Sequence, residues 1–237
     1  MKLTIFLILF SNALKAVEIE FKSGSKKVHL IELYTSESCS SCPPAEAWMN
    51  SFKAHPKLWK EFVPVEFHVD YWNYLSWVDK YSQKEYSKRQ RNYHKILSAG
   101  VYTPQFIHNA QDWRSWQKRK LPTDKKMAPE LKVNLNQTTG QVKFLIKTSK
   151  KNLNCHVALM GGGVSSKVKS GENKGKILQH EFAVLEYRSV TLSSGKCETK
   201  INLKPRLKTK NYSIAFWISD NSSFQIIQAT GGALKLN

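Results

Sequence analysis

The chain has 237 residues, 41% hydrophobic and 11% aromatic, a composition that excludes a disordered chain and suits one or two folded domains. Lys and Arg number 37 against 18 Asp and Glu, which gives a formal net charge of +19. Such a charge favours anionic partners, but the basic residues are scattered and match no nucleic-acid-binding motif. We therefore expect a solvated lysine-rich surface and no nucleic-acid partner.

The first sixteen residues have the layout of a secretory signal. A short basic start, Met1-Lys2, precedes the unbroken apolar run Leu3–Phe10, and small residues follow up to Ala16. The run is too short to span a bilayer, which takes about 20 apolar residues. A buried N-terminal strand or an uncleaved anchor is the alternative. The pattern predicts a signal peptide over residues 1–16, a periplasmic or secreted protein, and no stable membrane insertion after cleavage.

The next segment alternates strand and helix patterns. Val28–Tyr34 is β-branched and apolar, and a helical pattern opens at Pro43, with one face formed by Ala45, Trp48, Met49 and Phe52. Val63–Val69 is a second candidate strand. This order predicts a βαβ unit with two parallel strands.

A helical insertion is expected over residues 71–98. It starts with an aromatic cluster, becomes helical from about Ser82, and stops near Gly100. A short apolar run at Phe106-Ile107 and a helical piece at Asp112–Lys118 follow. Together these elements predict an α/β domain over residues 24–120.

The chain changes character after a polar, Pro-containing linker at 121–129. Short strand-like runs follow, bounded by glycines: Val142–Lys147, His156–Leu159, Glu181–Tyr187, Ile201–Leu203, Ser213–Ile218 and Gln225–Ala229. This spacing predicts a small, mostly antiparallel β domain over residues 130–237.

Two of the four cysteines, Cys39 and Cys42, stand two residues apart between the first strand and the helix. This position lets Cys39 face solvent as an attacking thiolate, with Cys42 behind it as the resolving thiol. A helix N-terminus lowers a thiol pKa, although Pro43 and Pro44 contribute no N–H donors. We expect a lowered pKa for Cys39.

Two alternatives to a redox dithiol remain. A static disulfide is one, although so short a loop removes little entropy from the unfolded chain. The other is Cu(I) held by both thiols, with His68 as a candidate third ligand. Structural zinc needs four ligands, and there is no second CxxC. The sequence leaves open whether the distant Cys155 and Cys197 form a structural bridge.

Several motifs resemble a known family as a set. The segment Glu32–Ser36 with Cys39–Ala45 resembles the active-site region of a thioredoxin-like family of secreted proteins, domain of unknown function family 1223. The match continues through His68–Trp72, Arg89-Gln90, Tyr93, Val101–Gln105, Gly171–Asn173, Gly175 and His180. The resemblance implies a thioredoxin-like fold with a trailing β domain.

The resemblance also implies roles for single residues. Pro104 occupies the place of the cis-proline that faces the dithiol in thioredoxin-like proteins, and Thr103 would offer its backbone to a substrate strand. Glu32 occupies nearly the place of a buried acid that helps deprotonate the resolving cysteine, one residue further from Cys39 than in thioredoxin. An edge-exposed Glu32 is the alternative.

The remaining candidates come from the second strand and the insertion. His68 and Asp70 alternate along the strand and would relay protons or shape a substrate groove; a structural His68 and a turn-capping Asp70 are the alternatives. Tyr71 and Trp72 either cover the dithiol site or belong to the hydrophobic core. Arg89 fits an ion pair with Asp70 or an exposed charge.

The sequence thus predicts an exported thioredoxin-like thiol–disulfide oxidoreductase. Cys39 and Cys42 are catalytic, Thr103 and Pro104 bind substrate, and no bound organic cofactor or metal site is assigned. Its partners would be exported thiol-containing proteins and a redox partner. A copper-binding or delivery protein using the same two thiols, or a non-catalytic thioredoxin-like binding module, is the alternative function.

Overall fold

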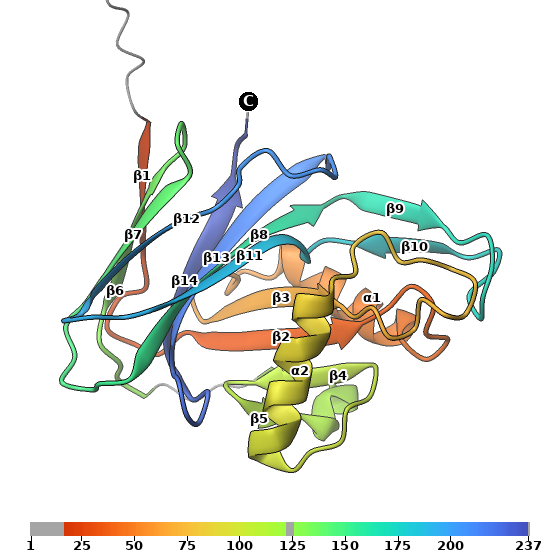
Figure 1. The fold of residues 1–237 in the computed structure, drawn as a ribbon, viewed down its shortest axis with the longest axis horizontal. Helices are drawn as coiled ribbons and strands as arrows, with labels where there is room; N and C mark the ends of the chain where they lie inside the picture. The colour runs from red at the N-terminus through yellow and green to blue at the C-terminus, as the bar shows by residue number, and fades with distance from the viewer. Residues whose placement is uncertain (1–16, 122–125, 237) are drawn as a thin grey trace, which may run out of the picture.

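The computed structural model describes residues 17–121 and 126–236, which form a mostly β fold with few helices (Figure 1). The predicted signal peptide, residues 1–16, lies outside the described residues. The helices are α1 (Pro43–Ser51), α2 (Lys84–Leu97) and the short 3₁₀ segments η1 (Phe52–Ala54) and η2 (Arg114–Lys118). The strands are β1 (Glu18–Lys22), β2 (His29–Thr35), β3 (Phe62–His68), β4 (Gln105–His108), β5 (Gln111–Asp112), β6 (Leu131–Asn136), β7 (Gln141–Ile146), β8 (Leu153–Gly162), β9 (Val164–Lys167), β10 (Ile177–His180), β11 (Ala183–Thr191), β12 (Lys196–Lys200), β13 (Asn211–Asp220) and β14 (Ile226–Leu234).

The largest sheet is mixed and has the strand order β14-β13-β8-β11-β3-β2-β4-β5. β3 is parallel to β2 on one side and to β11 on the other, whereas the other neighbours are antiparallel. A four-stranded antiparallel sheet, β1-β6-β7-β12, and the β9–β10 hairpin complete the fold. Strands from both predicted segments, 24–120 and 130–237, therefore lie side by side in one sheet.

The first strand of the βαβ unit is covered on both faces, since every residue of β2 is buried. Strand alternation sends Glu32 and Tyr34 to the face that α2 covers, where the Tyr34 and Tyr93 rings meet at 6.3 Å. Thr35 points to the opposite face, where its hydroxyl donates to Glu46 of α1. The two faces of β2 thus serve two different polar sites.

Helix α2 lies across β2 and β3 in Figure 1 and confirms the helix predicted within residues 71–98. Its residues Tyr86, Arg89 and Tyr93 are buried against the sheet. The helix ends at Ser98, which adopts the left-handed conformation with φ 49°.

The four-stranded sheet packs against β8 and β13 of the large sheet. Phe216 of β13 contacts Phe21 and Phe144 across this interface, with ring centroids 5.0 Å and 5.8 Å apart. A Cys155–Cys197 disulfide joins β8 to β12, and hence one sheet to the other. The pair that the sequence left open is therefore a structural bridge.

One predicted strand is wrong. Residues 201–203 are not a strand, and the pairing segment lies just before them, in β12. The Ile201 N–H donates to the Gly140 carbonyl, and the Asn202 side chain bonds Lys204 O and N–H, which builds a turn. The predicted helical piece at 112–118 starts with the short strand β5, and only 114–118 is helical, as η2.

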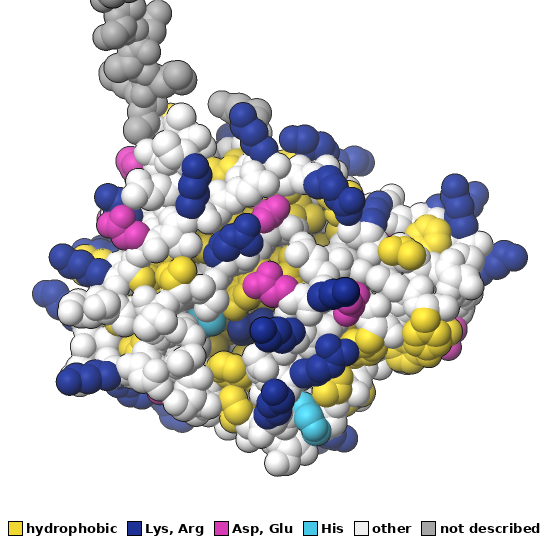
Figure 2. Space-filling view, in the orientation of Figure 1, with side chains coloured by type: hydrophobic (Ala, Val, Ile, Leu, Met, Phe, Trp, Pro, Cys, Tyr) yellow, Lys and Arg dark blue, Asp and Glu magenta, His cyan; other side chains and the backbone are white. Residues whose placement is uncertain are grey.

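Lysine and arginine side chains are spread over the visible face without one dominant patch (Figure 2). This distribution agrees with the scattered basic residues of the sequence. Within residues 17–121 and 126–236, no helix is long and apolar enough to cross a membrane.

Candidate functional site: the dithiol and a buried charge network

The dithiol loop runs from the end of β2 to the start of α1. The Cys39 N–H donates to the Ser36 carbonyl at 3.0 Å, and the Cys42 N–H donates to the Cys39 carbonyl at 3.2 Å. The Cys42 carbonyl accepts from Ala45 and Glu46, so Cys42 caps the helix that Pro43 opens. Both sulfurs are therefore held at the N-terminal end of α1.

Cys39 and Cys42 are free thiols and both are buried, with 2% and 0% of their surface exposed. The expectation that Cys39 faces solvent is wrong: the exposed residues of the motif are Ser40 and Ser41. The Ser41 hydroxyl lies 3.3 Å from the Cys39 sulfur and covers it.

The two thiols differ in acidity. A hydrogen bond from the Cys42 thiol, helped by Ser41 and Thr103, lowers the pKa of Cys39 to about 6. Burial raises the pKa of Cys42 well above its usual value, and the neighbouring Cys39 and Glu46 add to the effect. Cys39 is thus the thiolate at neutral pH and Cys42 is the protonated partner.

Glu46 stands one helical turn after Cys42, on the same buried side of α1. It accepts a 2.6 Å hydrogen bond from Thr35, whose hydroxyl also interacts with Cys42. Burial raises the pKa of Glu46 to about 7. A carboxyl group whose pKa is raised to about 7 therefore lies close to the Cys42 thiol.

The Thr103–Pro104 peptide bond is cis, and this loop stands beside the dithiol. Ser41 Oγ lies 3.5 Å from the Thr103 carbonyl, and the Trp72 indole N–H donates to Thr103 Oγ1 at 2.8 Å. Trp72 therefore supports the loop from the side. A groove of about 380 Å³ adjoins the loop and is lined by Ser41, Tyr102, Thr103, Pro104, Arg114, Trp116 and Gln117.

The structure does not bring Glu32 to the dithiol. Glu32 is buried, which excludes the edge-exposed alternative, but it lies on the α2 face of β2 and pairs with Arg89. It also accepts hydrogen bonds from Tyr34 and Tyr93. Because Thr35 and α1 lie on the other face, Glu46 occupies the place beside Cys42 that was expected of Glu32.

Asp70 and Arg89 are not partners, and Arg89 is not an exposed charge. Asp70 accepts a hydrogen bond from the hydroxyl of Ser87 on α2, and its own N–H donates back to that oxygen. This geometry fits the structural alternative for Asp70. Arg89 is buried, and its guanidinium lies over the rings of Phe67, Tyr93, Tyr187 and Trp217.

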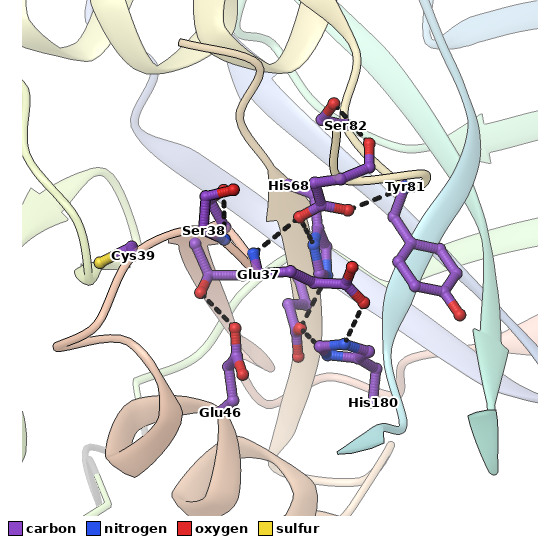
Figure 3. Close-up of polar contacts among 12 residues, drawn as sticks. Glu37, Ser38, Cys39, Glu46, His68, Tyr81, Ser82 and His180 are labelled. Atoms are coloured by element: carbon purple, nitrogen blue, oxygen red, sulfur yellow. Dashed lines mark hydrogen bonds and ion pairs between the residues drawn. The ribbon is translucent and has the colours of Figure 1, made fainter. Parts of the chain in front are cut away.

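His68 lies in a buried network behind the dithiol loop (Figure 3). Its Nδ1 lies 2.7 Å from Asp79 Oδ2, and its Nε2 lies 2.9 Å from Glu66 Oε1. His180 bonds the same Glu66 oxygen and also Glu37. Burial opposes the charge on both histidines, but the surrounding carboxylates raise the pKa of His68 well above its usual value and that of His180 to about 10.

Hydrogen bonds connect this network to the dithiol loop. Asp79 accepts the Glu37 N–H at 2.8 Å, and Glu37 accepts the Trp77 indole N–H. The Asn173 side chain donates to the Glu37 and Cys39 carbonyls, both at 2.9 Å, and Glu172 accepts the Ser40 N–H. The network therefore fixes the backbone of the loop, while the Cys39 sulfur points away from it in Figure 3.

Sequence reasoning assigned no role to Glu37, Glu46 or Asp79. Glu46 had one signal, an acid four residues after Cys42 within the otherwise apolar run from Pro43 to Met49. Asn173 and His180 were singled out only as parts of the family resemblance, and the structure places both at the loop.

Comparison with known proteins identifies the family. A family model described as "Protein of unknown function (DUF1223)" matches residues 30–219, most of the chain. The chain is a DUF1223 protein. No curated protein matches it.

Two solved structures resemble this DUF1223 protein. The crystal structure of protein AGR_C_4864 from Agrobacterium tumefaciens is 23% identical, with a TM-score of 0.58, and the match covers 89% of this chain and 98% of that one. The structure of HBP35 of Porphyromonas gingivalis is 13% identical, with a TM-score of 0.55, and the match covers 90% of this chain and 76% of that one. At these identities the likeness concerns the fold.

Proposed function

We propose that this protein is an exported thioredoxin-like thiol–disulfide oxidoreductase. The observation that carries the proposal is the position of two free thiols at the start of α1, with Cys39 next to Ser41 and Cys42 next to Thr35. In this arrangement the pKa of Cys39 is lowered to about 6 and that of Cys42 is raised. A static bridge needs no such difference. An exchange catalyst needs one thiolate that attacks the substrate and one protonated thiol that later resolves the mixed disulfide.

The thioredoxin-like assignment is supported by the arrangement around the dithiol. β2 and β3 are parallel and joined by α1, the CxxC motif stands at the start of that helix, and the cis Thr103–Pro104 loop adjoins it. The groove beside Thr103 is open to an extended segment of another protein.

The proposed reaction moves two electrons from the dithiol to a substrate disulfide. The Cys39 thiolate attacks one substrate sulfur, the substrate S–S bond breaks, and the other substrate sulfur leaves as a thiolate. Cys42 then gives its proton towards Glu46, through Thr35, and attacks the Cys39 sulfur. The second substrate thiolate leaves, and Cys39 and Cys42 are joined as a disulfide; the reverse sequence oxidises a substrate dithiol.

Export and the nature of the partners follow from separate observations. The signal pattern of residues 1–16 and the Cys155–Cys197 disulfide both suit an oxidising compartment outside the cytoplasm. The substrates would be exported proteins with thiols or disulfides, and a redox partner would restore the dithiol.

The reduction potential of the Cys39–Cys42 couple tests the proposal. The protein is equilibrated with glutathione buffers and followed by thiol alkylation and mass spectrometry, with a Cys155→Ser/Cys197→Ser variant as control. A potential between about −120 and −270 mV supports an exchange catalyst, and its value indicates the direction. A potential below about −300 mV would identify a static disulfide. The remaining function would then be that of a non-catalytic binding module.

Copper binding is the other outcome that would replace the proposal. His68 was the suggested third ligand for Cu(I) beside the two thiols. Both of its ring nitrogens are hydrogen-bonded to carboxylates instead, those of Asp79 and Glu66. Stoichiometric Cu(I) uptake that is lost in Cys39→Ser, together with no disulfide exchange, would favour the copper function.

A further inference from the structure

A second group of chemically versatile side chains lies behind the dithiol loop. Glu66 and His68 come from β3 and His180 from the end of β10, and all three are fully buried. One donor atom from each lies within 4.8 Å of the others. His68 Nε2 and His180 Nδ1 approach the same oxygen, Glu66 Oε1, at 2.9 Å and 3.0 Å.

The outward nitrogens of both histidines are held by carboxylates. His68 Nδ1 lies 2.7 Å from Asp79 Oδ2, and His180 Nε2 lies 3.2 Å from Glu37 Oε1. Metal-binding histidines almost always give their second N–H to such a partner, which fixes the ring and the tautomer. The inner nitrogens of the two rings are thereby aimed at one place.

Glu66 supplies an independent sign of a missing ligand. Its second oxygen, Oε2, is buried and has no hydrogen-bond partner among the described residues. Buried polar atoms are nearly always satisfied, and an unsatisfied carboxylate oxygen is costly. A cation beside Glu66 would satisfy this oxygen.

We propose that Glu66, His68 and His180 form a closed structural site for a divalent transition-metal ion of the zinc class. Two imidazole nitrogens and both oxygens of Glu66 provide four donors, a set that suits zinc and its neighbours better than Mg²⁺ or Ca²⁺. Glu66 would chelate the ion with the narrow bite of its carboxylate, whereas Zn–N and Zn–O bonds of about 2.0–2.2 Å at near-tetrahedral angles place each imidazole nitrogen about 3.4 Å from a carboxylate oxygen. The observed nitrogen–oxygen distances of 2.9 Å and 3.0 Å therefore need a shift of about half an ångström.

Metal binding at this site exchanges protons for the ion. Each histidine must present a lone pair at its inner nitrogen, so protons on His68 Nε2 and His180 Nδ1 leave as the ion enters. The outer N–H groups of His68 and His180 remain hydrogen-bonded to Asp79 and Glu37. Since the site is enclosed, the ion would hold β3, β10 and the segment from Asp79 together rather than bind substrate. This inference does not rest on the dithiol activity.

The test measures metal in the full protein and separates this site from the thiols. The protein is purified without chelator, and its metal content is determined by mass spectrometry, alone and after loading with Zn²⁺ and removal of the excess. The same is done for Cys39→Ser/Cys42→Ser, for His180→Gln, and for His156→Gln, a control at another buried histidine, which bonds Tyr187 and Ser219.

We expect about one Zn²⁺ per chain in the wild type, in Cys39→Ser/Cys42→Ser and in His156→Gln, and less than a tenth of that in His180→Gln. Asp79→Asn should weaken affinity about 10- to 100-fold. If His180→Gln does not fold, Co²⁺ loading of Cys39→Ser/Cys42→Ser replaces it, and d–d bands without a thiolate-to-metal charge-transfer band support the site. No bound metal, or metal that is lost with the two cysteines, would overturn the proposal and leave a metal-free ion-pair network.

Discussion

At the residue scale, two buried acids lie on opposite sides of β2: Glu32 belongs to the strand and faces α2, whereas Glu46 belongs to α1 and is met by Thr35 on the other face. Glu32 neutralises Arg89 beneath α2. Glu46 is linked through Thr35 to the thiol of Cys42. Spacing along the chain suggested the first acid for the dithiol, whereas the pleat of the strand selects the second.

The acidity of Cys39 leads to a direct prediction. Because its pKa is lowered to about 6, chiefly by the Cys42 thiol, alkylation by iodoacetamide should rise with a midpoint near pH 6. Cys42→Ala removes the donor and should move the midpoint towards about 8.5, the value of a free cysteine. Cys42→Ser keeps a donor and should leave the midpoint lower than in Cys42→Ala. Equal midpoints in these two variants would contradict the hydrogen-bond explanation.

The same pKa fixes the sign of one contribution to stability. A thiol whose pKa is lower in the folded state stabilises the reduced protein above its unfolded pKa of about 8.5. This contribution disappears as the pH falls through about 6. Urea denaturation of the reduced protein should therefore show a loss of stability between pH 8.5 and pH 6 that is smaller in Cys39→Ser.

Glu46 gives a second prediction about single residues. Glu46→Gln keeps an acceptor for Thr35 but cannot take the Cys42 proton, so resolution of a mixed disulfide should slow at least about tenfold near pH 7. The two phases of thiolate release from an aromatic disulfide reagent report attack by Cys39 and resolution by Cys42. Only the second phase should slow.

Glu32→Gln is the matched control for Glu46→Gln. It alters a buried acid on the other face of β2, so it should lower stability without changing the ratio of the two phases. A slower second phase in Glu32→Gln would mean that Glu32, and not Glu46, takes the proton of Cys42.

At the element scale, α2 packs on the sheet through the buried rings of Tyr86 and Tyr93 and through the ion pair between Arg89 and Glu32. Arg89→Met leaves the Glu32 carboxylate uncompensated and should cost about 3–5 kcal/mol of unfolding free energy. Glu32→Leu/Arg89→Met removes both charges and should cost less than the sum of the two single changes. Lys88→Ala, at an exposed position of the same helix, should change stability by no more than about 0.5 kcal/mol in urea denaturation.

Some elements of the fold could be predicted from the sequence, and others could not. β2, α1 and β3 were predictable because a long apolar pattern and the Pro43-Pro44 pair fix them locally. β1 and β6 were not identified, because each alternates only two or three apolar residues with charged or amide residues, and the partner across the pair lies more than a hundred residues away. The dithiol was visible as a motif, but the partners of its loop were not, because Asp79, Asn173 and His180 reach it only through the tertiary fold.

At the scale of the whole molecule, the Cys155–Cys197 disulfide ties two sheets together at a distance from the dithiol loop. It closes a loop of 42 residues, for which chain entropy predicts about 4 kcal/mol of stabilisation. Cys155→Ser/Cys197→Ser should therefore lower the free energy of unfolding by about 2–4 kcal/mol. The alkylation midpoint of Cys39 should not move. A shifted midpoint would mean that packing between the sheets reaches the dithiol.

The order of strands in the large sheet has a consequence for biosynthesis. The ribosome makes Cys39 and Cys42 early, yet Glu172, Asn173 and His180, which bind their loop and its supporting network, emerge more than a hundred residues later. A nascent chain therefore carries two thiols whose loop backbone is not yet fixed, and the side chains that fix it arrive only with the last third of the protein. A fragment that ends before Glu172 would contain the complete motif but lack the side chains that hold its loop in place.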